Sequence, residues 1–454
     1  MRTCFRLLGM IVLGAIPALA QMPMRPGGPD QPLPFLFYEA VNLVARDTAK
    51  SRIDIHYRID RDFFVAQKNT ETTSGPLFRR LGEIAIELAD STGTVSAREL
   101  DRLEIGADSP DRIPEQKEWY QGVFSFEVAP GPYTVIIEIT DMQSKRNVID
   151  RRRPIRALPF GERALQLSTP LFVAPAGDLR TTSELVPVNY GGDLLFSQPA
   201  GLYLEFVPPV TADSTVRVRA TISTLEPGAA KDGVSPPDSF ITIPVRKTFD
   251  IVPHIINGSP VYALTDSVPR NVAAFVLPLS AEQMLLRTFQ ISMSFTSGSR
   301  TFESKKDFRM VWPDMPFSLR DVDYALDALR YIATDRELDS LKSGSFESRR
   351  NNLEGFWKAR DKTPATAYNE LMTQYYRRVD HAVRTFGTLR QPDGYRSDRG
   401  RVYILYGPPT RTDRTLDPKS GFEEAWFYDR LNRKFIFRDE AKNGNYVLVS
   451  TTSS

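Results

Sequence analysis

Alternation of apolar and polar residues is the feature that most restricts the fold of this chain, and it recurs in short stretches over the first two thirds of the sequence. A period of two places one face of a β-strand in a core and the other face in water. The clearest stretch, residues 126–139 (FEVAPGPYTVIIEI), has two alternating runs around Pro130, which is typical of a hairpin or of a corner between two sheets. Similar runs predict strands at residues 53–59, 84–88, 202–206, 216–220, 241–243 and 288–295.

Many short strands separated by turns are typical of immunoglobulin-like sandwiches, and we expect two such all-β modules, at residues 35–156 and 157–312. The chain has 454 residues, which is enough for about three domains. Its hydrophobic content of 41% allows each domain to bury a core. The basic run Arg151-Arg152-Arg153-Pro154 is predicted to be a solvated connector, with a protease or anion site as the alternative.

The first twenty residues have the pattern of a secretory signal peptide, which is removed from the mature chain. Arg2 and Arg6 precede an apolar run that ends in the small-x-small cleavage site Ala18-Leu19-Ala20. An uncleaved membrane anchor is the alternative, but the run is short for a membrane span and contains Pro17. We therefore expect an exported protein, periplasmic or extracellular, whose mature chain begins with a flexible leader at residues 21–34.

The charge and cysteine content of the mature chain argue against several classes of function. Removal of Arg2 and Arg6 with the signal peptide leaves 56 basic residues against 56 acidic ones. A nucleic-acid binder would carry a basic excess, so no nucleic acid is expected as a partner. The single cysteine, Cys4, precedes the cleavage site, so the mature chain has no disulfide, thiol nucleophile or thiolate metal site. No stretch after the signal peptide is apolar over enough residues to span a bilayer.

Residue types that usually bind metals or activate nucleophiles are sparse. The three histidines, His56, His254 and His381, fall in three different predicted domains, and the sequence has no HExxH motif. We therefore expect no metal and no cofactor. The sequence also has no GxSxG motif and no Walker-type loop, which weakens hydrolase and nucleotide-binding hypotheses.

From Trp312-Pro313 onward, helical patterns replace the strand alternation. Residues 334–337 (TDRE) form a capping box at the start of a short helix, and residues 346–360 are predicted to form another helix. Thr363-Pro364 has the residues preferred at a helix start, and a long helix is predicted from there to Gly387.

A small sheet is expected after these helices. Four strands are predicted, at residues 401–406, 424–428, 434–437 and 446–449. Asn443-Gly444 is expected to form a tight turn between the last two, and residues 407–421 are expected to form a long loop. Helices followed by an antiparallel sheet predict an α+β domain over residues 313–454.

Within this region, short motifs follow one another in an order that identifies a family. They are Tyr331-Ile-Ala-Thr-Asp335, Phe356-Trp357, Asn369-Glu370, Gly394-Tyr395-Arg396-Ser397-Asp398, Gly407-Pro408-Pro409 and Glu424-Ala-Trp426-Phe-Tyr428. On these residues, the C-terminal third resembles the GWxTD domain of bacterial exported proteins, with Tyr395 in place of the family's Trp and Ser397 in place of its Thr. The resemblance implies a domain and an export route, and it implies no particular reaction.

The candidate site is the polar part of this motif with its flanks, namely Asp393, Tyr395, Arg396, Ser397, Asp398, Arg399 and Arg401. In a functional interpretation, Asp398 is the carboxylate of a cleft and the arginines hold an anionic group. In the structural interpretation, which we favour, Ser397 and Asp398 bond to loop backbone, while the arginines pair with Asp361, Glu370 or Glu424.

Three functions follow from these patterns. Tandem sandwiches favour a non-enzymatic interaction or scaffold module of the cell envelope, with an envelope protein as its partner. The first alternative is a carboxylate-based hydrolase of envelope glycan or peptide that uses Asp398. The second is a soluble ligand-binding protein with a pocket lined by aromatic residues of the C-terminal region, such as Trp357 and Tyr376.

Overall fold

The computed structural model describes residues 33, 35–47, 49–70, 76–107, 118–160, 167–174, 178–196, 198–207, 215–225, 241–247, 250–265, 272–297, 300–389, 391–417 and 421–452. The predicted signal peptide, residues 1–20, lies outside the described residues, as does the predicted leader, residues 21–34, apart from Leu33. Among the described helices, none is long and apolar enough to cross a membrane.

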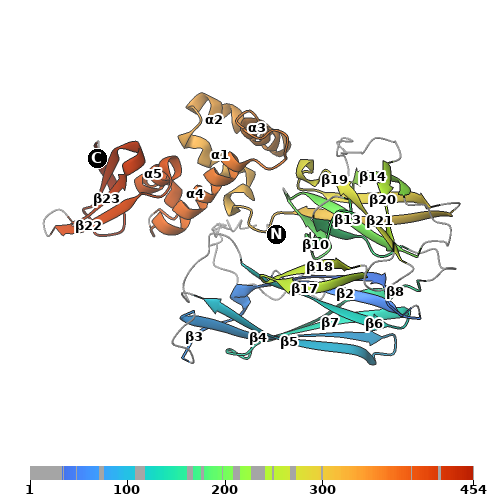
Figure 1. Ribbon diagram of the computed structural model, residues 1–454. Coiled ribbons are helices and arrows are strands. Elements are labelled where there is room, and N and C mark those ends of the chain that lie inside the picture. The colour runs from blue at the N-terminus through green and yellow to red at the C-terminus, as the bar shows by residue number, and fades with distance from the viewer. Residues whose placement is uncertain are drawn as a thin grey trace, which may run out of the picture.

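The first module is a sandwich of two antiparallel sheets (Figure 1). One sheet has the order β1-β2-β6, with strands β1 (Leu36–Val44), β2 (Ser51–Asp60) and β6 (Trp119–Val128). The other has the order β3-β4-β7-β8 with β5 also paired to β4; its strands are β3 (Ala66–Lys68), β4 (Phe78–Asp90), β5 (Val95–Ala107), β7 (Gly131–Asp141) and β8 (Asn147–Ala157). Inward residues such as Ile53, Ile84 and Ile137 are fully buried in the shared core.

Two features of this module resolve the expectations from the sequence. β6 pairs with β2 while β7 pairs with β4, so the turn at Pro130 is a corner that carries the chain from one sheet to the other. The run Arg151-Arg152-Arg153-Pro154 was expected to be a connector, but it lies inside the edge strand β8. An edge strand tolerates proline because one of its sides has no neighbour to receive the backbone hydrogen bond.

The second module is also a pair of sheets, with the orders β16-β19-β13-β9-β10-β18-β17 and β11-β12-β21-β20-β14-β15. The first sheet contains β9 (Leu171–Ala174), β10 (Glu184–Pro187), β13 (Ala200–Phe206), β16 (Arg246–Lys247), β17 (Asp250–Ile256), β18 (Ser259–Thr265) and β19 (Ala273–Leu279). The second contains β11 (Asn189–Tyr190), β12 (Asp193–Leu195), β14 (Thr215–Thr224), β15 (Ile241–Pro244), β20 (Thr288–Ser297) and β21 (Arg300–Val311). The alternation in β14 points Val216, Val218 and Ile222 into the core.

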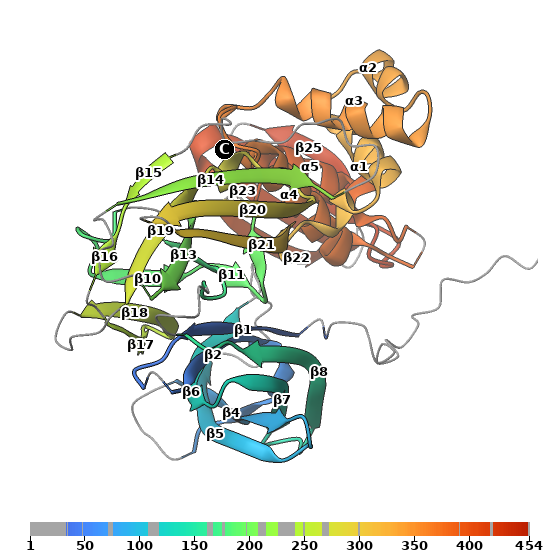
Figure 2. The same ribbon diagram turned by 90° about the vertical axis from the view of Figure 1, so that its right-hand side faces the viewer.

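A separate apolar core joins the two sandwiches. β1 contributes Val41, Leu43 and Val44, and the second module contributes residues that include Tyr203 and Tyr262. The hairpin of β17 and β18 lies at the boundary between the two modules, against β6 (Figure 2). β1 therefore has one part in the core of its own sandwich and another part in the joint.

A buried polar network accompanies this joint. The guanidinium of Arg52 donates two hydrogen bonds to the carboxylate of Asp54, at 2.8 and 2.6 Å, and the Tyr262 hydroxyl donates a third to Asp54 at 2.6 Å. His56 Nε2 lies 3.0 Å from the same hydroxyl, whose proton is already given to Asp54, so Nε2 is the protonated nitrogen of a neutral ring. Burial lowers the pKa of His56 to about 4.

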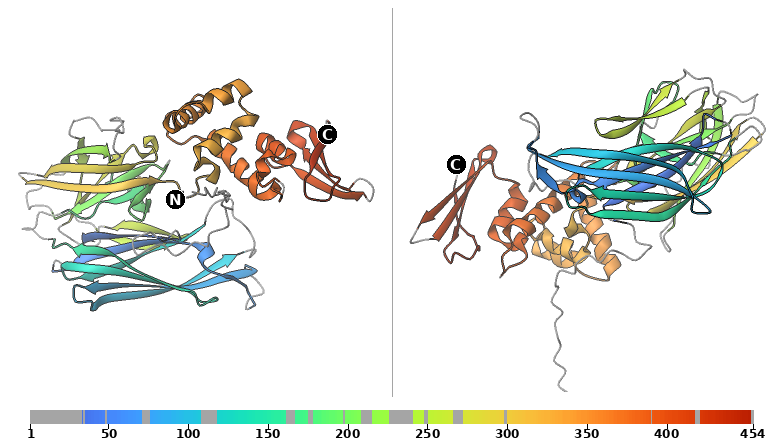
Figure 3. Two further views of the ribbon diagram at one scale, coloured as in Figure 1. Left: turned by 180° about the vertical axis from the view of Figure 1, so that it is seen from behind. Right: turned by 90° about the horizontal axis from the view of Figure 1, so that it is seen from below.

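The C-terminal region is built from helices followed by a four-stranded antiparallel sheet, and it projects to one side of the sandwiches (Figure 3). The helices are α1 (Val322–Ala328), α2 (Asp335–Leu341), α3 (Phe346–Lys358), α4 (Glu370–Phe386) and α5 (Asp398–Tyr406). The strands are β22 (Arg411–Asp417), β23 (Gly421–Tyr428), β24 (Arg433–Asp439) and β25 (Val447–Thr452), in that order across the sheet. The predicted fold class, two all-β modules followed by an α+β domain, is confirmed.

Four details of this region differ from the sequence prediction. Residues 401–406 were predicted as a strand but belong to helix α5, and the predicted loop at residues 407–421 contains strand β22. α4 begins at Glu370, capped by Asn369, and not at Thr363-Pro364. The connection from β24 to β25 spans residues 440–446, so it is longer than a two-residue turn.

An aromatic contact fixes the C-terminal region to the second sandwich. The rings of Phe196, Trp312 and Tyr368 have centroids 5.4 to 6.0 Å apart, and they come from the second sandwich, the connection and the segment before α4. The Ala367 N–H donates a hydrogen bond of 2.7 Å to the Glu282 carbonyl of the second sandwich. These contacts hold residues 363–369 outside the helix and explain its late start.

Candidate functional site

The motif begins as a single 3-10 turn, Gly394–Arg396, wedged between α4 and α5. A Cβ atom on Gly394 would lie 2.2 Å from the carbonyl oxygen of Ala382 in α4, and one on Gly400 would lie 2.1 Å from the carbonyl oxygen of Gly394. Both distances are far below van der Waals contact, so only glycine lets these three backbone segments approach. The two glycines of the motif therefore serve packing.

Ser397 and Asp398 start helix α5. The Ser397 hydroxyl accepts a hydrogen bond of 3.0 Å from the Gly400 N–H and donates one of 2.7 Å to the Gly394 carbonyl, which makes it an N-cap. Asp398 is the acidic residue of the first turn, and its Oδ2 accepts a hydrogen bond of 2.8 Å from the Leu448 N–H in β25. Both side chains thus bond to backbone groups.

Tyr395 reaches from this turn into the helical layer. Its side chain is 1% exposed, and its hydroxyl donates a hydrogen bond of 2.5 Å to Asp327 Oδ2 on α1. Arg396 Nε donates to the same hydroxyl at 3.0 Å, and its Nη2 donates to Asp327 at 2.7 Å. A tryptophan, the family's residue here, also has a single ring donor, so the contact to a carboxylate is compatible with either side chain.

Asp327 is the centre of this arrangement. Its carboxylate also accepts hydrogen bonds from Lys342 Nζ at 2.7 Å and from Arg330 Nη2 at 2.6 Å. Partial burial by itself raises the pKa of Asp327, but the hydrogen bonds from Lys342, Tyr395 and Arg330 outweigh burial and hold the pKa well below its usual range. Asp327 is therefore ionised at neutral pH.

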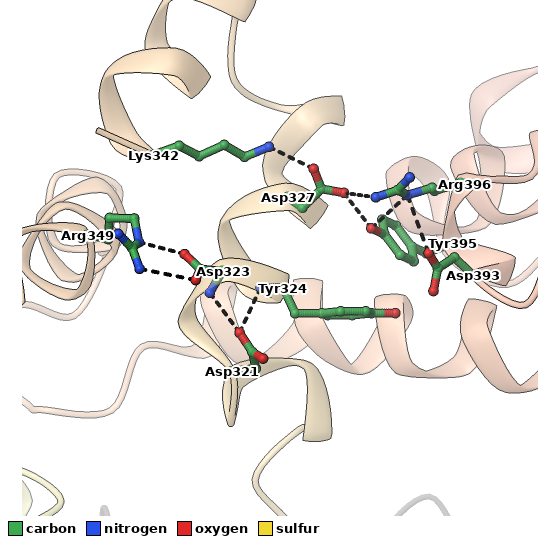
Figure 4. Close-up of a pocket in the computed structure, with 9 residues that line it drawn as sticks. All are labelled: Asp321, Asp323, Tyr324, Asp327, Lys342, Arg349, Asp393, Tyr395 and Arg396. Atoms are coloured by element: carbon green, nitrogen blue, oxygen red, sulfur yellow. Dashed lines mark hydrogen bonds and ion pairs between the residues drawn. The ribbon is translucent and has the colours of Figure 1, made fainter. Parts of the chain in front are cut away.

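The groups around Asp327 line an open basin of about 600 Å³ (Figure 4). Four carboxylates and three cations converge on it, together with two tyrosines: Asp321, Asp323, Asp327, Asp393, Lys342, Arg349, Arg396, Tyr324 and Tyr395. Arg349 pairs with Asp323 at 2.6 Å, and Arg396 reaches Asp393 at 3.6 Å. We call this feature the charged basin.

Arg399 and Arg401 lie outside the charged basin. Arg399 is largely buried, donates a hydrogen bond of 3.1 Å to Glu424 and stacks over the Tyr446 ring at 4.0 Å. Arg401 is half-exposed and lies 3.4 Å from Asp398, three residues earlier on the same helix. Of the pairings considered from the sequence, only the one with Glu424 is present among the described residues.

The sequence pattern and the charged basin overlap in part. Of the predicted site residues, Asp393, Tyr395 and Arg396 line the basin. Ser397 caps α5, Asp398 and Arg399 bond to groups of the sheet, and Arg401 is half-exposed beside Asp398. Six basin residues from the first three helices and the ends that flank them were not predicted from the sequence, namely Asp321, Asp323, Tyr324, Asp327, Lys342 and Arg349. Asp327 had one detectable signal, since it interrupts a run of small and apolar residues in α1.

The chemistry available in the charged basin is ionic recognition. Every cation in it is paired with a carboxylate, and a ligand that offers both charges can exchange with these pairs. Among the described residues, no cluster of His, Cys, Asp and Glu has the arrangement of a metal site. The C-terminal aromatics named as pocket candidates, Trp357 and Tyr376, are buried in the core of this region instead.

Comparison with known proteins supports the assignment of the C-terminal region. Residues 296–453 match the family model of the GWxTD domain, and the match begins within β20. Among curated proteins, none matches this chain.

Two solved structures have low similarity to the sandwiches. The D1–D4 ectodomain fragment of ICAM-5 is 11% identical over 62% of this chain and 54% of that chain, with a TM-score of 0.15. The collagen adhesin (CNA) from S. aureus is 6% identical over 59% of this chain and 93% of that chain, with a TM-score of 0.11. This chain thus spans about half of the ICAM-5 fragment, and similarities this low carry no argument about function. The family match and the geometry of the motif agree, and residues 296–453 of the chain are a GWxTD domain.

Proposed function

We propose that the protein is an exported component of the cell envelope that acts as a non-enzymatic interaction module. The observation that carries this proposal is the way the modules are joined. The two sandwiches share a buried core through β1, and the aromatic contact of Phe196, Trp312 and Tyr368 attaches the GWxTD domain. A chain built in this way holds its surfaces in a fixed relation to one another, as a scaffold requires.

The charged basin is the binding surface in this proposal. Its opposite charges are held in place by helix caps and ion pairs, and a protein partner with complementary charges would dock by exchanging these pairs for intermolecular ones. Such charged surfaces contribute to the rate and the specificity of association more than to affinity. Association with the partner should therefore be slower and weaker at high ionic strength.

The geometry gives less support to a carboxylate-based hydrolase. A general acid needs a carboxyl group whose pKa lies near neutral pH. Asp327, the central carboxylate of the basin, has a pKa that is held low, and Asp398 has one oxygen committed to the Leu448 N–H. These contacts favour charged recognition over proton transfer.

The experiment is a cross-linking capture of the tagged full-length protein from the envelope of its native host, combined with cell fractionation. The test variant is Arg349→Glu, which reverses one charge in the basin. The matched control is Arg350→Glu on the same helix, because Arg350 also pairs with a carboxylate, Glu354, but does not line the basin.

The proposal expects one stoichiometric partner protein that is lost with Arg349→Glu and retained with Arg350→Glu. Equal capture by both variants would remove the basin from the proposal. Recovery of the protein from the cytoplasm, with its N-terminal residues still attached, would contradict the export.

A further inference from the structure

A second cavity lies where the three modules meet. It has a volume of about 290 Å³ and is lined by residues from β2, β6, β11, the ends of β12 and β21, and α4 with the segment before it. We call it the junction pocket. Pockets at domain junctions are common ligand sites, and this volume is close to the lower end of the usual range, about 300 Å³.

Two aromatic pairs line the junction pocket. Trp119 and Tyr190 have ring centroids 5.3 Å apart in an edge-to-face contact. Trp312 and Tyr368 are 5.5 Å apart, again edge to face. Trp119, Trp312 and Tyr368 are only partly buried, so their rings border the open space of the pocket.

Arg58 supplies a positive charge to the junction pocket. Its guanidinium lies 5.3 Å from the centre of the Tyr190 ring, and burial lowers its pKa. In the part of the chain that the structure describes, Arg58 has no carboxylate within ion-pair distance. A desolvated guanidinium without a counter-charge is costly, and an anionic ligand removes that cost.

Tyr190 contributes a second polar group that lacks a partner among the described residues. Its side chain is 1% exposed, and within the described residues its hydroxyl has no hydrogen-bond partner. A buried hydroxyl normally has a partner, so this one has unused hydrogen-bonding capacity beside the pocket that Tyr190 lines. Polar groups at the rim, Gln198 and the paired Asp314 and Arg377, offer further donors and acceptors.

We propose that the junction pocket binds an acidic saccharide, with the carboxylate of one sugar residue on Arg58 and its ring against the aromatic side chains. The guanidinium fork matches the two oxygens of a carboxylate. Aromatic faces pack against the apolar C–H face of a pyranose ring, while the Tyr190 hydroxyl and the rim residues receive the sugar hydroxyls. A pocket of this volume has room for a single sugar residue, so a polymer would be held by one residue or by its end.

The test is calorimetric titration of the full-length protein with glucuronate and galacturonate, compared with glucose and with acetate. Glucose keeps the ring but lacks the carboxylate, and acetate keeps the carboxylate but lacks the ring. An acidic sugar should bind more tightly than either comparison compound by about tenfold or more. Quenching of tryptophan fluorescence should accompany binding, because Trp119 and Trp312 line the pocket.

Three variants separate binding from folding. Arg58→Met should weaken binding of the acidic sugar by about tenfold or more, while the Tm stays equal or rises because an uncompensated buried charge is removed. Arg52→Met on the same strand should lower the Tm, since it leaves Asp54 buried without its partner. Gln198→Trp, at an exposed rim position, should block the pocket without any change in Tm.

Three outcomes would overturn the proposal. The first is that no acidic sugar binds, or that each binds no better than glucose. The second is that acetate binds as well as glucuronate, which would reduce the pocket to a simple anion site. The third is preferential binding of an acetylated dipeptide with a C-terminal aromatic residue, which would make the ligand a peptide carboxylate.

Discussion

The hydroxyl of Tyr395 donates a 2.5 Å hydrogen bond to the carboxylate of Asp327, and the two residues are separated by 68 positions in the chain. This contact ties the motif turn to helix α1 across the charged basin. Tyr395→Phe keeps the ring in the core and removes the hydroxyl that donates to Asp327 and accepts from Arg396. It should therefore lower the stability of the GWxTD domain by at least about 1.5 kcal/mol, the lower end for a hydrogen bond to a charged group. The shift in Tm of the full-length protein measures this loss.

Tyr406→Phe is the control for that substitution. The Tyr406 hydroxyl accepts a hydrogen bond from Arg433 at an exposed position, so its loss should change stability by less than about 0.5 kcal/mol. Equal changes in Tm for the two substitutions would show that the hydrogen bond to Asp327 stabilises the domain no more than an exposed one does.

The close approach of the motif glycines predicts opposite effects of the same substitution in two helices. Gly400→Ala in α5 places a Cβ against the Gly394 carbonyl and should destabilise the domain by at least about 1–3 kcal/mol, as overpacking does. Gly355→Ala in α3 meets no atom within 4 Å and should stabilise the domain by about 0.5–1 kcal/mol, because alanine is the better helix former. Differential scanning calorimetry of both variants tests this pair.

Asp398→Asn separates the structural and the functional interpretations of the motif. The amide keeps an oxygen for the Leu448 N–H but loses the negative charge at the N-terminus of α5 and beside Arg401. The free energy of unfolding should therefore fall by roughly 0.5–1 kcal/mol. An unchanged Tm would remove the main support for the structural interpretation and return Asp398 to the list of functional candidates.

His56 should make the joint between the sandwiches sensitive to mild acid. Its ring is neutral in the folded protein with a pKa of about 4, whereas the unfolded chain takes up a proton near pH 6.5. The contribution of the neutral His56 ring to the free energy of unfolding is therefore complete above about pH 6.5. It is lost as the pH falls toward 4, and the loss is on the order of 3 kcal/mol. His56→Phe should flatten the decline of Tm between about pH 7 and about pH 4.5.

The control for this prediction is His254→Phe, since His254 is exposed on β17. That variant should follow the wild-type profile. A parallel decline of all three proteins would assign the acid sensitivity to other groups.

The strands of the sandwiches could be predicted from the sequence because each has one wet face and one buried face. Helix α5 could not be predicted from the sequence, because of the elements that surround it. It is covered by α4 on one side and meets β25 on another, so Gly400, Val402 and Ile404 are all buried and the burial alternates as it does in a strand. A helix buried on two sides has no single apolar stripe.

The predicted start of α4 was wrong for a different reason. Thr363-Pro364 has the local chemistry of a helix start, but Ala367 and Tyr368 are held by the second sandwich. Tertiary contacts of this kind override local preference, and no local pattern reports them.

The same limit applies to the sites. The motif around Tyr395 was visible in the sequence, whereas its partner Asp327 is defined only when α1 packs against the motif turn. The junction pocket was not visible at all, because Arg58, Tyr190 and Trp312 come from separate modules and are brought together only by the assembly of the chain.

The shared strand β1 sets the order in which the sandwiches can mature. β1 is synthesised first, but its Val44 N–H bonds to Glu205, 161 positions later, and the adjoining Arg46 binds Asp250, 204 positions later. Closure of such long loops is slow, and until it happens Val41 and Leu43 have no cover. A fragment that ends at residue 157 should therefore expose the apolar residues of β1 and aggregate. During synthesis, the same residues are a defined segment for a chaperone to bind.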